Sequence, residues 1–410
     1  MSYKIFWGFI KIMFNNLLNN IHFYFLLYIL LFSQSIKASE TLTIWSSHQN
    51  HEFLAAMSNK FQEKHDVKIS IVQLDPSEIK AEIILSAQDN VFPDLVVIPS
   101  DFLGLHKMMN LWPIPDDWYK EKLNQMVRST VKSKSKCWGV PLIQGNFLLL
   151  YYNKKYVSHP ATDFDDILLQ KKTFLAKNIM PMGWNYNDMY YLMPFLSAFN
   201  GKPIEDGKIT LNTPAMINAL KYYRFLAQQN IVNPECDYRC SQDDFVEGKS
   251  AYAINGDWAY RDLKNVLGDD LGVAVLPKIH GHRMHPMSST FVLAIPNYER
   301  HSKQKQQLIK AFSEFVQQPS SQQLVYEKTD LLPVSMAYYK QLKQNASGDH
   351  KILFRQMALT TPMSSSLNMS IAWQAMAIGF QRYQAGATAE YSAQHMQKMA
   401  IEQMNQLDEN

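Results

Sequence analysis

The segment that decides the fold is residues 41–99, which reads TLTIWSSHQNHEFLAAMSNKFQEKHDVKISIVQLDPSEIKAEIILSAQDNVFPDLVVIP. Three short apolar stretches within it, 41–45, 67–73 and 94–99, are typical of β-strands. The residues between these stretches carry apolar side chains every three or four positions, which indicates helices packed on a sheet. This alternation predicts a mostly parallel sheet with helices on both faces. Ligands of such sheets bind beyond the carboxyl ends of the strands.

Strand and helix signals continue along the chain, so the expected fold class is α/β. Residues 140–153, VPLIQGNFLLLYYN, are too apolar for a linker and too interrupted by proline and glycine for one helix. We therefore expect a strand that crosses from one lobe of the protein to another. Thr213 followed by Pro214 predicts an N-cap and the first residue of a helix. Two more buried strands are expected at 271–277 and 290–296.

Length and charge narrow the class of protein. A chain of 410 residues, 47% of them hydrophobic, suggests two or three domains or one large two-lobed fold. Its formal net charge is +3, but three lysines fall in the first 38 residues, where no acidic side chain occurs. The remainder is neutral and has no basic stripe, which argues against a nucleic-acid partner.

Residues 1–38 have the order of a secretory signal peptide. Lys4 and Lys11 precede an apolar run at 21–32, and small residues follow up to Ala38. We expect export to the periplasm with cleavage after Ala38. The alternative is an uncleaved membrane anchor, although the apolar run is shorter than the roughly 20 residues that span a bilayer.

Export makes the cysteines informative, because an oxidising compartment permits disulfide bonds. Cys236 and Cys240 lie four residues apart in the polar stretch NPECDYRCSQDD, and we predict that they bridge to each other. A zinc site built on this pair would need a second pair of ligands at matching spacing, and none is evident. Cys137 is left over and is expected to pack beside Trp138.

Several segments in the same order carry a specific resemblance. They are TLTIW (41–45), FPDLVVIPSDFLG (92–104), GVPLIQGNFLLLYYNKK (139–155), FVEGKSAYAINGDWAY (245–260), LGVAVLPKI (271–279) and NMSIAWQAM (368–376). With them the chain resembles the periplasmic solute-binding proteins of ABC transporters, and within these the maltose/maltodextrin-binding branch. The resemblance implies a two-lobed periplasmic-binding-protein fold of type II, with hinge strands between the lobes and the ligand in the cleft between them.

The resemblance also implies the lobe limits and the function. The N-terminal lobe would comprise residues 39–143 and 273–322, and the C-terminal lobe 144–272 and 323–410. The protein would be the substrate-binding component of an importer, a monomer that captures a maltodextrin-like oligosaccharide. It would deliver the sugar unchanged to a membrane permease with its ATPase, and it would need no cofactor or metal. Such proteins work by hinge closure around the ligand.

Candidate ligand-binding residues follow from the matched segments. Trp258 and Trp373 match the positions at which maltodextrin binders stack glucose rings, and Asp101 matches a sugar-binding aspartate. The stretch GWNYNDMYYLMP resembles the family segment that supplies an acid and two aromatic residues. The remaining candidates are Trp184, Tyr186 and Asp188 in that stretch, Trp45, Ser47 and His48 after the first strand, and Gln144 and Asn146 in the crossing strand.

Several positions depart from the family pattern. Neither an acid nor a lysine stands at Ser47 or His48, and Ile98 and Phe102 replace a tryptophan and an arginine. Residues near Gln144 replace a glutamate. Lost polar contacts change specificity sharply, so the alternatives to maltose are another oligosaccharide, a polyol or a glycerol-phosphate compound.

Two other functions receive less support. The cluster HGHRMH at 280–285 could bind a metal, but its place between two strands favours a solvated loop. The chain contains no G-x-S-x-G and no H-E-x-x-H motif. An exported glycoside hydrolase would need two carboxylates facing one bond, and it stays an alternative.

Overall fold

The structure is a computed structural model that describes residues 40–47, 51–76, 78–120, 123–133 and 135–408. The first two described residues group with 66–68 in a small unit, while 42–65 and 69–408 form the large unit that carries the core and the cavity. The predicted signal peptide and His48 lie outside the described residues. Within the described ranges, no helix is both long enough and apolar enough to cross a membrane.

The first sheet of the described residues has seven strands in the order β16-β6-β15-β3-β1-β2, with β17 beside β15. Its strands are β1 (Glu40–Ser47), β2 (Val67–Leu74), β3 (Leu95–Pro99), β6 (Val140–Gly145), β15 (Met287–Ala294), β16 (Leu332–Pro333) and β17 (Thr361–Pro362). β1 and β3 run parallel, but β15 is antiparallel to both β3 and β6. The predicted parallel pairing holds for β1 and β3, but the sheet as a whole is mixed, because β15 returns from the second sheet and runs opposite to both of its neighbours.

The second sheet has the order β12-β7-β11-β8 among the described residues. Its strands are β7 (Leu148–Asn153), β8 (Met180–Gly183), β11 (Ser250–Gly256) and β12 (Leu271–Ala274). β7 pairs antiparallel with β11 and β12, and β11 runs parallel to β8. Three small hairpins complete the strands: β4 (Lys132–Ser133) with β5 (Lys136–Cys137), β9 (Ile204–Glu205) with β10 (Lys208–Ile209), and β13 (Lys278–Ile279) with β14 (His282–Arg283).

The expected crossing at 140–153 consists of two strands rather than one. β6 ends at Gly145 in the first sheet and β7 begins at Leu148 in the second. Gly145 and Asn146 both have positive φ, +148° and +52°, which breaks the extended backbone between the two sheets. The chain returns to the first sheet between Ala274 and Met287, and the β13–β14 hairpin lies on this return.

The lobe limits from the sequence stay a prediction, and the strands bear on each of them. The limit at 143/144 falls inside β6, the limit at 272/273 inside β12, and the limit at 322/323 inside the helix α11 (Pro319–Thr329). Because β16 pairs with β6, the chain remains with the first sheet as far as Pro333. The sheets thus favour crossings later than those predicted, namely after Gly145, after Ala274 and after Pro333.

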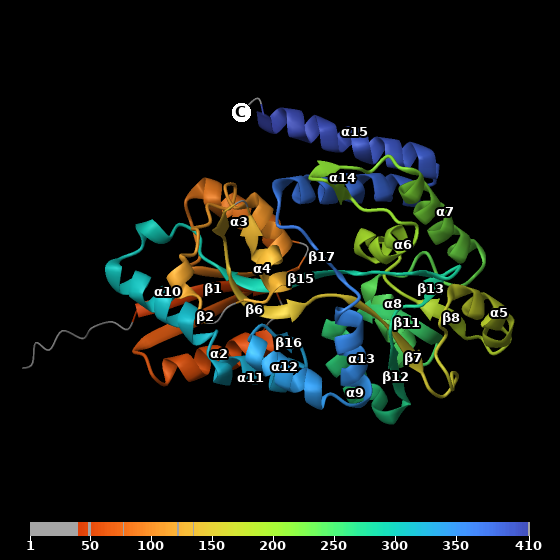
Figure 1. Ribbon diagram of the computed structural model, residues 1–410, viewed down its shortest axis with the longest axis horizontal. Helices are drawn as coiled ribbons and strands as arrows, with labels where there is room; N and C mark the ends of the chain where they lie inside the picture. The colour runs from red at the N-terminus through yellow and green to blue at the C-terminus, as the bar shows by residue number, and fades with distance from the viewer. Residues whose placement is uncertain (1–39, 48–50, 77, 121–122, 134, 409–410) are drawn as a thin grey trace, which may run out of the picture. The chain divides into compact units, whose positions relative to one another are not determined.

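Helices cover both faces of the two sheets (Figure 1). On the first sheet α2, α11 and α12 lie along one face, and α3 and α4 along the other. The α-helices are α2 (His51–Gln62), α3 (Ile79–Asp89), α4 (Gln125–Val131), α5 (Phe164–Leu175), α6 (Met193–Ala198), α7 (Pro214–Gln228), α8 (Tyr238–Val246), α9 (Tyr260–Leu267), α10 (Lys303–Phe315), α11 (Pro319–Thr329), α12 (Met336–Asn345), α13 (Gly348–Met357), α14 (Leu367–Gln384) and α15 (Ala389–Asp408).

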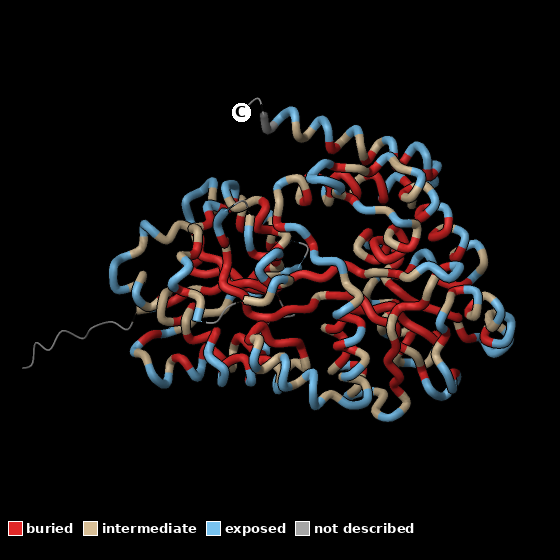
Figure 2. Tube along the Cα trace, viewed as in Figure 1, coloured by how far each residue is buried: buried red, intermediate tan, exposed pale blue. Residues whose placement is uncertain are grey.

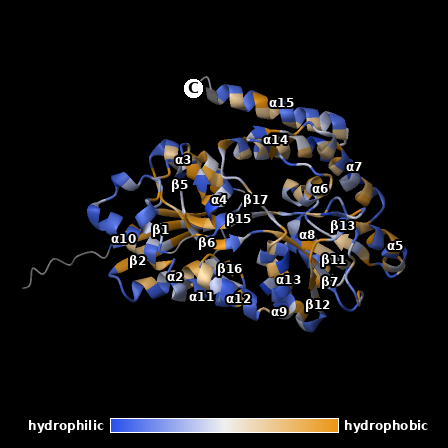
Figure 3. Cartoon of the chain, in the orientation of Figure 1, coloured by the Kyte–Doolittle hydropathy of each residue, from blue (hydrophilic) through white to orange (hydrophobic). Residues whose placement is uncertain are grey.

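Local sequence signals explain where these helices form. Phe53, Met57 and Phe61, spaced by four, are all fully buried on α2, as the sequence predicts. The Thr213 hydroxyl accepts a hydrogen bond from the backbone N–H of Met216 at 3.2 Å, so Thr213 caps α7 as expected. Burial is concentrated in the strands of both sheets, and so is hydrophobic character (Figures 2 and 3).

Candidate functional site

A cavity of about 720 Å³ lies between loops that follow strands of the two sheets. From the first sheet it is lined by Asp75, Pro76, Lys80, Pro99, Asp101 and Phe102, and from the rest of the chain by Asn146, Asn185, Asp188, Tyr190, Tyr191, Tyr238, Trp258, Met363 and Trp373. Pro99 is the last residue of β3, and Asp101 lies in the 3-10 turn η2 (Ser100–Leu105) that follows. The cavity therefore opens at the carboxyl end of this strand, as the sequence predicts.

Three aromatic rings form one wall of the cavity. Tyr190 comes from the 3-10 turn η4 (Met189–Leu192), Trp258 from η5 (Asp257–Ala259) just after β11, and Trp373 from α14. The Tyr190 ring centroid lies 6.2 Å from that of Trp258 and 6.0 Å from that of Trp373. All three side chains are only partly buried. They offer flat apolar faces of the kind on which the C–H faces of a sugar ring stack.

Carboxylates complement this aromatic wall. Burial raises the pKa of Asp101, and the positive charge of Lys80 opposes this rise. The Lys80 ammonium also lies 4.3 Å from the centroid of the Phe102 ring, a cation–π contact. Desolvation likewise raises the pKa of Asp188, although its Oδ1 accepts a 2.8 Å hydrogen bond from the backbone N–H of Tyr190. Both carboxylates can accept hydrogen bonds from ligand hydroxyls.

The crossing between the two sheets, residues 145–147, lies at the edge of the cavity and is held by hydrogen bonds from several other segments. The Asp257 carboxylate accepts hydrogen bonds from the backbone N–H groups of Asn146 at 3.1 Å and Phe147 at 3.3 Å. The Asn146 amide donates to the Ser289 hydroxyl at 2.9 Å on the returning strand β15. Tyr190 donates its hydroxyl to the Asn146 carbonyl. An aromatic residue of the cavity wall thus contacts the crossing directly.

Asp257 holds this crossing from a buried position. It is 5% exposed, and burial raises its pKa to about 7 in spite of the backbone N–H groups that it accepts from. A Cβ atom at Gly145 would lie 2.2 Å from Asp257 Oδ2, so only glycine fits beside the carboxylate. The sequence has a glycine there because the backbone and the carboxylate approach so closely.

The structure brings five of the predicted site residues to the cavity: Trp258, Trp373, Asp101, Asp188 and Asn146. They come from segments that are far apart in sequence and meet at the loops between the sheets. Their contact with a ligand stays a proposal.

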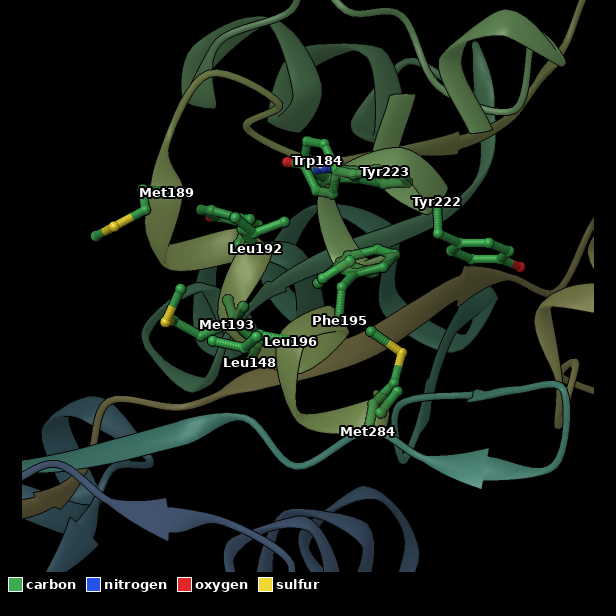
Figure 4. Close-up of a cluster of buried hydrophobic side chains, with 14 of the residues drawn as sticks. Leu148, Trp184, Met189, Leu192, Met193, Phe195, Leu196, Tyr222, Tyr223 and Met284 are labelled. Carbon is green, nitrogen blue, oxygen red and sulfur yellow. Dashed lines mark hydrogen bonds between the residues drawn. The ribbon is translucent and has the colours of Figure 1, made fainter. Parts of the chain in front are cut away.

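Trp184 and Tyr186, two of the predicted ligand contacts, do not line this cavity and lie in the core instead. Trp184 is fully buried, and its Nε1 donates a 2.6 Å hydrogen bond to the Tyr223 hydroxyl inside the apolar core (Figure 4). Tyr186 packs on the Tyr223 ring at 4.5 Å, and its hydroxyl donates to the Tyr223 carbonyl. The chain after β8 turns these two rings toward α7, and the next turn presents Asp188 and Tyr190 to the cavity instead.

Trp45, Ser47 and Gln144 also lie outside the cavity lining. Trp45 packs against the apolar core of the first sheet, and Ser47 is buried. Gln144 is 1% exposed, and its amide donates to the Pro333 carbonyl at 2.6 Å. Its side chain therefore holds β16 to β6 and is not free to meet a ligand.

Sequence reasoning missed several lining residues, among them Lys80, Tyr190, Tyr191 and Tyr238. Tyr190 and Tyr191 lie inside a stretch that was recognised, but the choice among its aromatic residues depends on a 3-10 turn that periodicity does not reveal. Tyr238 stands between Cys236 and Cys240, which are joined by a disulfide bond. Cys137 is a buried free thiol in the core of the first sheet.

The matched family model covers residues 56–347 and is that of the bacterial extracellular solute-binding proteins. The chain belongs to this family. Two relatives of this solute-binding protein carry names that state a ligand. A maltotriose-binding protein of Pyrococcus abyssi is 27% identical over 252 residues, 59% of this chain and 54% of that protein. The maltodextrin-binding protein MdxE of Bacillus subtilis is 23% identical over 362 residues, 83% of this chain and 84% of that protein.

A solved structure supports the architecture of the solute-binding protein. The maltose/maltodextrin-binding domain MalE from Bdellovibrio bacteriovorus, bound to maltotriose, matches with a TM-score of 0.80 at 22% identity. The match covers 89% of this chain and 100% of that chain. It shows that the fold is the two-lobed α/β fold of periplasmic binding proteins, as the sequence predicts.

Proposed function

We propose that this protein is the substrate-binding component of an ABC importer and captures a neutral, maltodextrin-like oligosaccharide in the cavity between its two lobes. It acts in the periplasm after removal of residues 1–38, as a monomer that passes the sugar unchanged to a membrane permease and its ATPase. The observation that carries the proposal is that three aromatic residues, Tyr190, Trp258 and Trp373, line one cavity together with the carboxylates of Asp101 and Asp188.

The chemistry of the cavity favours an oligosaccharide over the other solutes considered. Successive sugar rings can stack on several aromatic faces, while their hydroxyls donate to Asp101 and Asp188. A polyol has no ring face to stack. The ligand names of the relatives from Pyrococcus abyssi and Bacillus subtilis point the same way.

Charge argues against a glycerol-phosphate ligand. The lining contains three aspartates and one lysine, Lys80, whose ammonium already lies over Phe102 and beside Asp101. A phosphate would meet a lining of net negative charge and would need cations or helix N-termini aimed at it. A neutral ligand meets no such repulsion.

The test is a titration of the chain from Ser39 to Asn410, followed by tryptophan fluorescence, with maltose, maltotriose, longer dextrins, other disaccharides, polyols and glycerol phosphate. We expect a saturable change with the glucans and none with glycerol phosphate. Replacing Trp258 or Trp373 by alanine should weaken glucan binding at least about tenfold, because a stacked ring is lost. Trp112→Ala is the matched control, since Trp112 stacks on Tyr298 at 4.1 Å and does not line the cavity.

Product analysis separates this receptor from a glycoside hydrolase. After prolonged incubation with the protein, a receptor returns maltotriose intact, whereas a hydrolase releases shorter sugars. Shorter products that disappear in Asp101→Asn or Asp188→Asn would overturn the proposal in favour of the enzyme.

A further inference from the structure

Tyr238 is a cavity residue whose hydroxyl is held in place by its neighbours. It lies at the start of α8 and lines the cavity beside Trp258. The Trp258 Nε1–H donates a 3.1 Å hydrogen bond to the Tyr238 oxygen, and the Asn255 side chain also hydrogen-bonds this hydroxyl. Because the oxygen accepts from the indole, its own proton remains available to donate into the cavity.

The Cys236–Cys240 disulfide encloses Tyr238 in a short covalent loop. The two Cα atoms are 5.3 Å apart, and the bridge spans the first turn of α8. Within this loop Asp237 caps the helix, since its Oδ1 accepts a 2.8 Å hydrogen bond from the backbone N–H of Cys240. α8 has nine residues, and a helix this short is marginal without tertiary support. The bridge therefore fixes the turn from which Tyr238 projects.

The same loop also contacts the segment that carries other lining residues. The backbone N–H of Tyr186 donates a 3.2 Å hydrogen bond to the Cys236 carbonyl. Tyr186 lies between Asn185 and Asp188, which both line the cavity. Asn255 links Tyr238 to this segment as well, because its Oδ1 accepts a hydrogen bond from the Tyr191 hydroxyl at 3.4 Å. Displacing the loop would thus move several cavity residues together.

We propose that the Cys236–Cys240 disulfide is a positioning device for the ligand cavity: it fixes Tyr238, which orients the Trp258 indole and donates its hydroxyl to the bound sugar. Tyr238 is thereby a specificity-determining residue, because its donor needs an acceptor on the ligand. The contact with sugar rests on the proposed function, whereas the effect of the disulfide on Trp258 does not depend on any ligand.

The ligand-free effect can be measured by nuclear magnetic resonance of the indole N–H groups. The Trp258 signal is assigned with Trp258→Phe in the chain from Ser39 to Asn410. Tyr238→Phe should shift this signal upfield, since the hydrogen bond to the phenol oxygen is lost, and the double variant Cys236→Ser/Cys240→Ser should shift it in the same direction. Tyr391→Phe and Cys137→Ser, which alter residues outside the cavity lining, should leave it in place. An unchanged Trp258 signal in a folded double variant would overturn the positioning role.

The ligand contact is measured by titration with maltotriose. Tyr238→Phe and the double cysteine variant should each weaken binding about two- to tenfold, the range for one hydrogen bond. The triple variant should bind almost as tightly as the weaker of these two, because the Tyr238 contact is already lost when the disulfide is absent. A triple variant whose loss equals the product of the separate losses would contradict the proposal.

The two arms also separate this inference from the proposed function. If the unaltered protein binds none of the glucans, the proposed function fails, and the Trp258 signal still decides whether the disulfide positions Tyr238. If glucans bind and Tyr238→Phe binds them as tightly as the unaltered protein does, the assignment of Tyr238 as a ligand contact is wrong.

Discussion

Replacing Asp257 by asparagine is expected to remove a large part of the dependence of stability on pH between about pH 4 and pH 7. Burial raises the pKa of Asp257 from 3.8 to about 7 in the folded protein. The folded state therefore holds this proton more tightly than the unfolded chain does. The stability that Asp257 contributes is complete below its unfolded pKa and is lost as the pH rises through its folded pKa.

The size of the effect follows from the shift. Each pKa unit corresponds to about 1.4 kcal/mol, so the free energy of unfolding should fall by on the order of 4 kcal/mol across this range because of Asp257. Its titratable neighbours Tyr151 and Tyr190 do not contribute, since burial raises their pKa values well above the usual value. Asp101 and Asp188 have pKa shifts of the same direction, and they are present in both proteins.

The assay is denaturant unfolding of the unaltered protein and Asp257→Asn at several pH values from 4.5 to 7.5. The difference in unfolding free energy between the two proteins cancels the other groups. In Asp257→Asn the side-chain NH2 group replaces one carboxylate oxygen, so one backbone N–H loses its acceptor. This loss lowers the free energy of unfolding by about 1–3 kcal/mol at every pH. Relative to the unaltered protein, Asp257→Asn should therefore gain stability as the pH rises. A difference that stays constant over the whole range would mean that Asp257 does not take up a proton on folding, contrary to this prediction.

Four further substitutions, one of them a control, have predicted effects. Gly145→Ala should lower the free energy of unfolding by more than about 2 kcal/mol in denaturant titrations, because φ is +148° and Asp257 Oδ2 lies where the Cβ would go. Gly207→Ala, also at positive φ but with open space, should cost only about 1–2 kcal/mol; equal losses would contradict the close approach. Thr213→Ala should cost about 1 kcal/mol through the lost cap of α7, and a neutral result in thermal unfolding would refute the cap. Trp184→Phe should lower the free energy of unfolding by about 1–3 kcal/mol while maltotriose affinity stays within about twofold. A large loss of affinity would mean that Trp184 contacts the ligand after all.

Apolar spacing in the sequence predicted several strands and helices, because it reflects burial directly, and six matched segments indicated the resemblance to two-lobed binding proteins. The four-residue spacing of Phe53, Met57 and Phe61 is an example, since all three are fully buried. Strand direction was harder to predict. β15 reaches the first sheet from the other lobe, and local pattern carries no information on the direction of such a return.

The site was predicted in part, and the residues that were missed share a physical cause. The stretch after β8 is visibly rich in aromatic residues, but which of them line the cavity depends on the turn η4. Trp184 therefore goes to the core and Tyr190 to the wall. Lys80 was missed because it belongs to a helix whose amino end meets the cavity only after folding.

Calorimetric titration of the chain from Ser39 to Asn410 with maltotriose, beside Trp258→Ala and Trp112→Ala, measures directly whether the cavity binds an oligosaccharide. We expect saturable binding of one sugar per protein, weakened at least about tenfold by Trp258→Ala and unchanged by Trp112→Ala. Binding that is equally strong in Trp258→Ala, or no heat of binding with the unaltered protein, would contradict this expectation.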